Sequence, residues 1–180
     1  MKRTLLAAFC TAVLLSSSAC GGGGQVDSGA SVATASFKAE LLRQSASGAS
    51  PFTFSNAQAQ CAASRVVTAI GTTGLRTYGL LNAANKATAK TLDDTTLSPT
   101  DASAVVNAII DCLGEAAVTR TLTAAVSKSL TGTRTAAQRA CLDAKLTIAA
   151  LKPVLIDTLT GKRAAAQAFY QGLASCIPKK

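Results

Sequence analysis

Four cysteines, placed alike in two similar parts of the chain, most constrain the fold. Segment 57–61 (AQAQC) compares with segment 137–141 (AQRAC), and each part closes with an apolar helical pattern whose last turn holds a second cysteine. If the first and last helices of each part are antiparallel, the start of one lies beside the end of the other. Of the three pairings that four cysteines allow, this favours Cys61–Cys112 and Cys141–Cys176. A link from Cys61 to Cys141 or to Cys176 would contradict it.

The first twenty residues have the layout of an export signal. Lys2 and Arg3 precede an apolar run of 11 residues, 5–15, which is too short to span a bilayer but long enough for a signal-peptide core. Small residues and then Cys20 follow. This resembles the bacterial lipoprotein signal, in which the cysteine thiol receives diacylglycerol and becomes the first residue after cleavage. The resemblance implies a signal peptide over residues 1–19 and lipidation of Cys20.

One position departs from the lipoprotein pattern, so a secreted protein remains the alternative. Ser17 stands where that pattern usually has Leu, and Ser17 with Ala19 also suits an ordinary signal peptidase. The cysteine count favours lipidation. Removing Cys10 with the signal leaves five of the six cysteines, an odd number, whereas lipidating Cys20 leaves four to pair.

The lipoprotein signal implies a cell-envelope protein, anchored to a membrane on its extracytoplasmic side. In a host with two membranes, Gly21 after the anchor cysteine indicates the outer membrane. Residues 20–53 are rich in Gly, Ser and Ala and are expected to form the anchor and a flexible linker, with at most one or two helical turns over 37–43. The folded domain is expected over 54–180.

The composition and local patterns predict an all-α domain. Aromatic residues make up 4% of the chain, so the core must come from Ala, Val, Leu and Ile. The clearest helix start is Ser98 to Asp101, with a cap, a proline at the first helical position and an acid in the first turn. Thr135 with Gln138 matches a capping box. We expect a bundle of about five to seven helices in two disulfide-closed halves, 54–114 and 135–177.

Three stretches are less certain. Ser55 or Asn56 is expected to cap a helix that Gly71 ends, with a short second helix after it. Residues 82–96 are polar, although 83–92 is compatible with a helix. Pro153 is expected to kink its helix or to start a new one.

The layout of the cysteines, glycines and caps over residues 55–177 resembles a loose set of small exported helical proteins and lipoproteins from high-GC Gram-positive bacteria. Their function is unknown, so the resemblance implies a fold and a compartment and no activity. The glycine run 21–24 is also common in other bacterial lipoproteins, which leaves the lineage open.

The charge favours some partners over others. Without the signal, 16 basic residues face nine acidic ones, a net charge of +7. A cationic surface suits anionic lipid, an anionic wall polymer or another envelope protein. Nucleic acid is not expected as a partner, because no basic run has interleaved aromatic residues.

The sequence offers no set of residues for catalysis, metal ligation or cofactor binding. The chain has no His to activate a serine, and Ser127 and Lys128 point in different directions on a helix. Asp93 and Asp94 read as a solvated turn rather than an acid/base pair. Metal ligation is not expected, since the cysteines lack close spacing. Segment 71–74, with glycines at both ends, lacks the context of a phosphate-binding loop.

These observations lead to one hypothesis and two alternatives. The leading hypothesis is a non-catalytic, lipid-anchored interaction or structural module of the cell envelope. The first alternative is a carrier of a small apolar ligand or lipid, held in a pocket between the helices. The second, a hydrolase, requires a cleft with convergent polar side chains.

Overall fold

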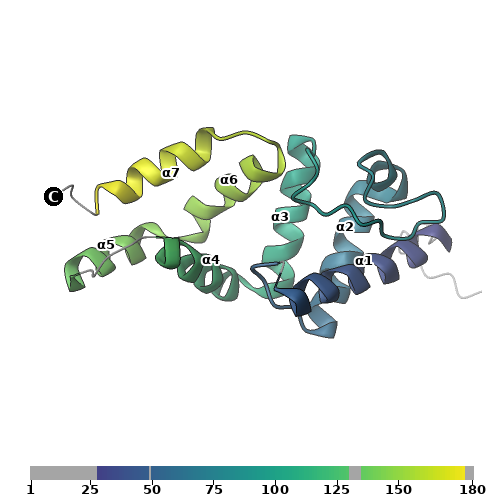
Figure 1. The fold of residues 1–180 in the computed structure, drawn as a ribbon, viewed down its shortest axis with the longest axis horizontal. Coiled ribbons are helices and arrows are strands. Elements are labelled where there is room, and N and C mark those ends of the chain that lie inside the picture. The colour runs from purple at the N-terminus through teal and green to yellow at the C-terminus, as the bar shows by residue number, and fades with distance from the viewer. Residues whose placement is uncertain (1–27, 49, 130–134, 177–180) are drawn as a thin grey trace, which may run out of the picture.

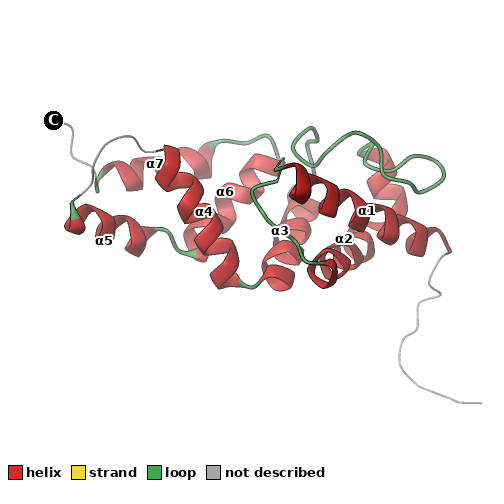
Figure 2. Cartoon of the chain, turned by 60° about the horizontal axis from the view of Figure 1, so that its bottom comes forward, coloured by secondary structure: helices red, strands yellow, loops and turns green. Residues whose placement is uncertain are grey.

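Helices α1 to α3 form one end of an elongated molecule, and α4 to α7 form the other (Figures 1 and 2). The computed structural model describes residues 28–48, 50–129 and 135–176, and this part of the chain is all-α, as predicted. The helices are α1 (Ser28–Ser47), α2 (Asn56–Thr77), α3 (Pro99–Leu113), α4 (Glu115–Ser129), α5 (Ala136–Lys145), α6 (Ile148–Leu159) and α7 (Ala164–Ala174).

The two disulfides pair as the repeat predicts. Cys61 bonds to Cys112 with their Cα atoms 5.7 Å apart, which joins α2 to the last turn of α3. Cys141 bonds to Cys176 with a Cα separation of 5.6 Å, which joins α5 to the residues just after α7. Both separations are ordinary for disulfides. The predicted two-hairpin arrangement is therefore confirmed.

Helix α1 corrects the expected linker. We expected residues 20–53 to be flexible, but Ser28–Ser47 is a continuous helix packed along α2 (Figure 1). Ala33, Phe37 and Leu41 are at most 8% exposed. Their spacing of four residues places them on one face, which packs into the main core. The folded part therefore begins before residue 54. Burial of these apolar side chains against the core stabilises the helix in its packed position.

Helix α2 begins as predicted, and its regular helical backbone is interrupted at Gly71, also as predicted. The Ser55 hydroxyl accepts a hydrogen bond from the backbone N–H of Gln58, whose side chain accepts one from the Ser55 N–H. This is a capping box, and it matches the predicted one at Thr135 and Gln138 in the other half. At Gly71 the backbone has φ 76° and ψ 158°, which is not helical, and a short second helical stretch follows it and ends at Thr77.

Helix α3 starts where predicted, and Tyr78 forms hydrogen bonds with its first residues. Ser98 caps the helix by accepting a hydrogen bond from the Asp101 N–H, and Pro99 occupies the first turn. The Tyr78 hydroxyl donates to the Asp101 carboxylate at 2.6 Å and accepts from the Ser98 N–H at 3.1 Å. At the other end, Gly114 adopts φ 85°, and α4 leaves at 106° to α3. The sharp bend sends the chain into the second half.

Residues 83–92 form a loop, although their sequence is compatible with a helix. The Asn82 side chain accepts hydrogen bonds from the N–H groups of Ala84 and Lys86, a local arrangement that competes with helix formation. The Ala87 N–H donates to the Ser36 hydroxyl of α1 at 2.7 Å. The loop is therefore fastened to α1.

The second half has a much smaller core than the first. Pro153 lies inside α6, which begins at Ile148, so the alternative that a new helix starts at Pro153 is wrong. The Asp157 carboxylate of α6 accepts from the Ala165 N–H at 2.6 Å, which caps α7. The main core joins α1, α2 and α3 to one buried residue each of α4 and α6, Val118 and Leu159. The separate cluster has five buried members: Leu142, Leu146, Leu151, Leu173 and Cys176.

Candidate functional site

The predicted site residues fall into two groups. Cys20 and the signal peptide 1–19 lie outside the described residues. Cys61, Cys112, Cys141 and Cys176 are all in disulfides. Within the described ranges, no group of three or more His, Cys, Asp or Glu side chains is placed to hold a metal ion.

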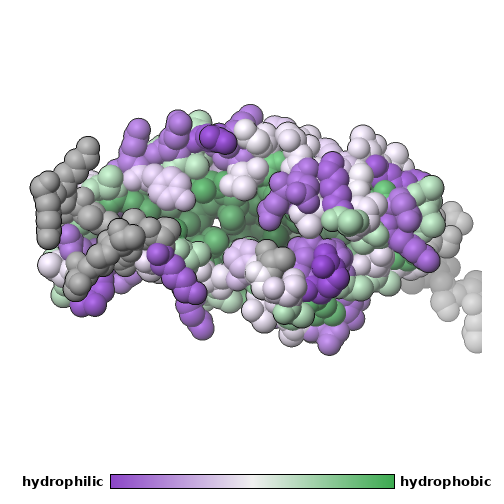
Figure 3. All heavy atoms as spheres, viewed as in Figure 1, coloured by the Kyte–Doolittle hydropathy of each residue, from purple (hydrophilic) through white to green (hydrophobic). Residues whose placement is uncertain are grey.

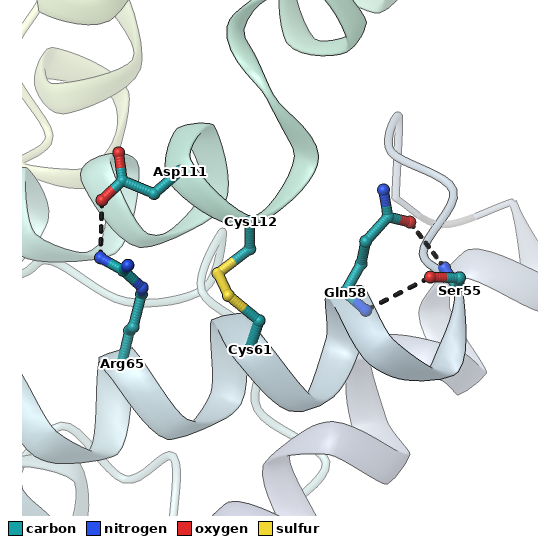
Figure 4. The surroundings of a disulfide bond; sticks show 6 residues. All are labelled: Ser55, Gln58, Cys61, Arg65, Asp111 and Cys112. Atoms are coloured by element: carbon teal, nitrogen blue, oxygen red, sulfur yellow. Dashed lines mark hydrogen bonds and ion pairs between the residues drawn. A yellow bond between two sulfur atoms is a disulfide. The ribbon is translucent and has the colours of Figure 1, made fainter.

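An ion pair and a helix cap surround the first disulfide (Figure 4). One helical turn beyond Cys61, Arg65 donates from Nη1 to Oδ2 of Asp111 at 2.7 Å. The two side chains are 56% and 48% exposed, so water screens the pair and its contribution is about 0–1 kcal/mol. The ion pair and the disulfide both join α2 to α3, whereas the Ser55 cap is local to the start of α2.

Asp93 and Asp94 lie in an exposed turn, and the Asp94 carboxylate bonds back to Thr91. Asp94 Oδ2 accepts from the Thr91 N–H at 3.0 Å and from the Thr91 hydroxyl at 2.8 Å. These hydrogen bonds to Thr91 hold the pKa of the Asp94 carboxyl below its ordinary value of 3.8. The arrangement is the predicted turn.

The other polar candidates are held within helices. Arg76 donates from Nε to the Thr72 carbonyl at 3.3 Å, so its guanidinium lies along its own helix. Segment 71–74 spans the break inside α2, and the element before it is a helix rather than the strand that precedes a phosphate-binding loop. On α4, Ser127 is half-buried and Lys128 is exposed.

An apolar cavity of about 250 Å³ lies where α1, α3 and α6 meet. We call it the interface cavity. Val105 and Val106 of α3 form its floor and are almost fully buried. Its other apolar walls come from α1, the chain after it, the loop before α3, a further residue of α3, and α6. These walls are Leu41, Pro51, Phe52, Leu92, Ile109, Leu155 and Leu159.

The interface cavity joins the two halves. Its α6 wall ends at Leu159, whose carbonyl accepts a hydrogen bond from the Leu97 N–H at 2.8 Å. Leu97 directly precedes the cap of α3. This backbone hydrogen bond places the end of α6 beside the start of α3. It therefore sets the distance between the α6 wall and the α3 wall of the cavity.

The polar groups of the interface cavity carry no positive charge. They are Gln44, Ser50, Asp93 and Thr158, and no Lys or Arg is among the lining residues. Gln44 donates from Nε2 to the Glu40 carboxylate at 2.7 Å, which orients its amide. The hydrogen bond from Arg43 holds the pKa of Glu40 below its ordinary value of 4.5.

A second apolar cavity of about 240 Å³ lies in the other half, between α4, α6 and α7. We call it the C-terminal cavity. The space-filling view shows hydrophobic residues around a hollow between α4 and α6 (Figure 3). Its lining residues are Leu122, Ala125, Val126, Leu151, Val154, Leu155, Phe169 and Tyr170. The Phe169 and Tyr170 rings meet edge to face, and Tyr170 is 56% exposed.

Sequence reasoning anticipated a pocket between the halves but not its lining. Leu41 was assigned to the linker and Leu92 to an ambiguous stretch, so neither was a candidate. The four-residue spacing of Ala33, Phe37 and Leu41 is the signal that would have found α1. The frequent Ser and Gly residues around it obscured that signal.

Comparisons with protein-family models, curated proteins and solved structures give no match for this chain. Among the described residues, no single helix is long and apolar enough to cross a membrane. Helices α3 and α4 have the combined length and composition, but they are bent by 106°. The two disulfides indicate an exported, extracytoplasmic protein.

Proposed function

We propose that this protein is a non-catalytic, lipid-anchored module of the cell envelope that binds a small apolar ligand in the interface cavity. The observation that carries the proposal is the cavity of about 250 Å³, with nine apolar walls and four polar lining residues. A concave, mostly apolar site with few polar groups is the usual form of a small-molecule site.

Two further observations support the envelope location. The disulfides require an oxidising compartment to form and persist. The basic start, the short apolar run and Cys20 form the pattern of a lipoprotein signal. Mass spectrometry of the protein from its host tests the anchor: Cys20 should carry diacylglycerol, and Cys20→Ser should remove the protein from the membrane fraction. An unmodified Cys20 in the membrane fraction would overturn this part.

Ligand binding is tested with N-phenyl-1-naphthylamine, an uncharged apolar fluorophore, on the Cys20→Ser protein with both disulfides intact. The native cavity should bind it saturably. Ile109→Trp and Leu92→Trp each place an indole in the interface cavity from a different element, so each should weaken binding at least tenfold. Ala149→Trp is the control, since Ala149 is exposed on α6 and lines neither cavity. Equal binding by all four proteins would overturn the proposal.

A second candidate function is contact with an anionic wall polymer, and the charge distribution favours it. In the described part of residues 115–176, seven basic residues face three acidic ones, whereas the described part of residues 28–114 has six against five. The seven are Arg120, Lys128, Arg139, Lys145, Lys152, Lys162 and Arg163. Co-sedimentation with purified cell wall should fall steeply with salt if this contact is used, and salt-independent sedimentation would contradict it.

A further inference from the structure

The interface cavity and the C-terminal cavity share one wall, the side chain of Leu155 on α6. Towards the end of α6, Thr158 and Leu159 line the first cavity. Towards its start, Leu151 and Val154 line the second. The two cavities therefore follow one another along α6, and a single half-buried side chain belongs to both.

We propose that the ligand is a linear lipid chain with an uncharged polar head, which runs through the interface cavity, past Leu155, into the C-terminal cavity. The inference rests on the proposed function, because it names the class of ligand that the interface cavity binds. A compact ligand needs only one cavity. A linear chain can use both, because the two cavities adjoin at Leu155, the one residue that lines both.

The polar residues indicate which end of the chain lies where. All four polar lining residues of the interface cavity come from outside α3, and Gln44 and Asp93 offer hydrogen-bonding groups there. The lining of the C-terminal cavity has only one polar group, the Tyr170 hydroxyl. The head group therefore belongs in the interface cavity and the apolar end in the C-terminal cavity.

The charge of the lining selects an uncharged head group over a carboxylate. Moving an anion out of water is costly unless a cation pairs with it. Neither cavity is lined by Lys or Arg, and Asp93 brings a negative charge to the first. An alcohol head can instead donate a hydrogen bond to the Asp93 carboxylate, and an ester carbonyl can accept one from the Gln44 amide, without that cost.

The occupancy of both cavities is tested by chain length. Affinities of 1-octanol, 1-dodecanol and 1-tetradecanol are measured by displacement of the fluorophore from the Cys20→Ser protein. Each further buried CH₂ group should raise the affinity by up to about fourfold, so the longer alcohols should bind much more tightly. Val154→Trp fills only the C-terminal cavity and should abolish this gain while leaving 1-octanol affinity unchanged. Ala149→Trp, on the same helix, should keep the gain.

Each outcome bears on a different claim. If 1-octanol binds but the longer alcohols bind no more tightly, or if Val154→Trp weakens all three equally, the two-cavity path is wrong and the proposed function stands. If the fluorophore itself does not bind, so that there is nothing for an alcohol to displace, the proposed function fails. Dodecanoate should bind at least tenfold more weakly than 1-dodecanol at neutral pH, and an equal affinity would overturn the uncharged head group.

Discussion

The hydroxyl of Tyr78 donates a hydrogen bond to the carboxylate of Asp101 at 2.6 Å, across 23 residues of sequence. The same hydroxyl accepts from the N–H of Ser98, the residue that caps α3. The hydroxyl thereby joins the end of α2 to the start of α3. The Cys61–Cys112 disulfide joins the same two helices at the other end of α3.

This relationship predicts the effect of removing one oxygen atom. Tyr78→Phe leaves the Ser98 N–H without its acceptor and leaves the partly buried Asp101 carboxylate with the Ser98 hydroxyl as its remaining side-chain donor, so it should lower the free energy of unfolding by about 1–3 kcal/mol. Tyr170→Phe is the control, because that side chain is 56% exposed, and it should change stability by less than about 0.5 kcal/mol. Urea denaturation measures both. Equal effects would show that the Tyr78 hydroxyl contributes nothing specific.

The burial of α1 predicts that it is part of the stable fold. Phe37 is 5% exposed in the main core, so Phe37→Ala should cost about 3–5 kcal/mol. Val32 lies on the same helix but is 43% exposed, and Val32→Ala should cost less than about 0.5 kcal/mol. Thermal and urea unfolding test the pair. If Phe37→Ala were as mild as Val32→Ala, residues 28–47 would be the linker that the sequence first indicated.

Removal of each disulfide should lower amide protection from hydrogen exchange in a different set of helices. They close loops of 51 and 35 residues, so the chain-entropy model gives each about 4 kcal/mol. The second joins the smaller cluster, in which Cys176 is itself one of five buried members. Replacing Cys141 and Cys176 by Ser should therefore abolish amide protection in α5 and α7 while α2 and α3 stay protected.

Hydrogen exchange measures this difference, with the Cys61→Ser, Cys112→Ser protein as the matched control. That change should lower protection in α2 and α3, because it releases the main core. Uniform loss of protection throughout both proteins would contradict two separately stabilised halves.

Acid should destabilise the protein through Glu40 and Asp94. Both carboxyls have a pKa below their ordinary values of 4.5 and 3.8, because Arg43 and Thr91 hydrogen-bond to their charged forms. The stability that these bonds add is present above the ordinary values and is lost as the pH falls through the lowered pKa values. Stability should thus decline below about pH 4.5.

The variant Glu40→Gln, Asp94→Asn should show a shallower decline over the same pH range, as measured by urea denaturation. Asp93→Asn is the control, because Asp93 is exposed and accepts no hydrogen bond within the part of the chain that the structure describes. A decline as steep as that of the native protein would show that other groups govern its acid sensitivity.

The sequence by itself determined the features that depend on neighbours in the chain. The caps at Ser55, Ser98 and Thr135 each need a side chain within three residues, so they can be read directly. The disulfide pairing followed as well, because antiparallel helices bring the start of one beside the end of the other. The turn at Asp94 is local for the same reason.

Only the tertiary structure decided how the halves meet. Leu41, Val106 and Leu155 lie on three helices far apart in the chain, and nothing local specifies that they share a cavity. Helix α1 has little helical signal of its own, since it consists largely of small residues, and it is held by packing on α2. The sharp bend at Gly114 and the contact of Leu97 with Leu159 then fix α6 against α3. These are long-range contacts, whose favourable free energy exists only once the whole core has assembled.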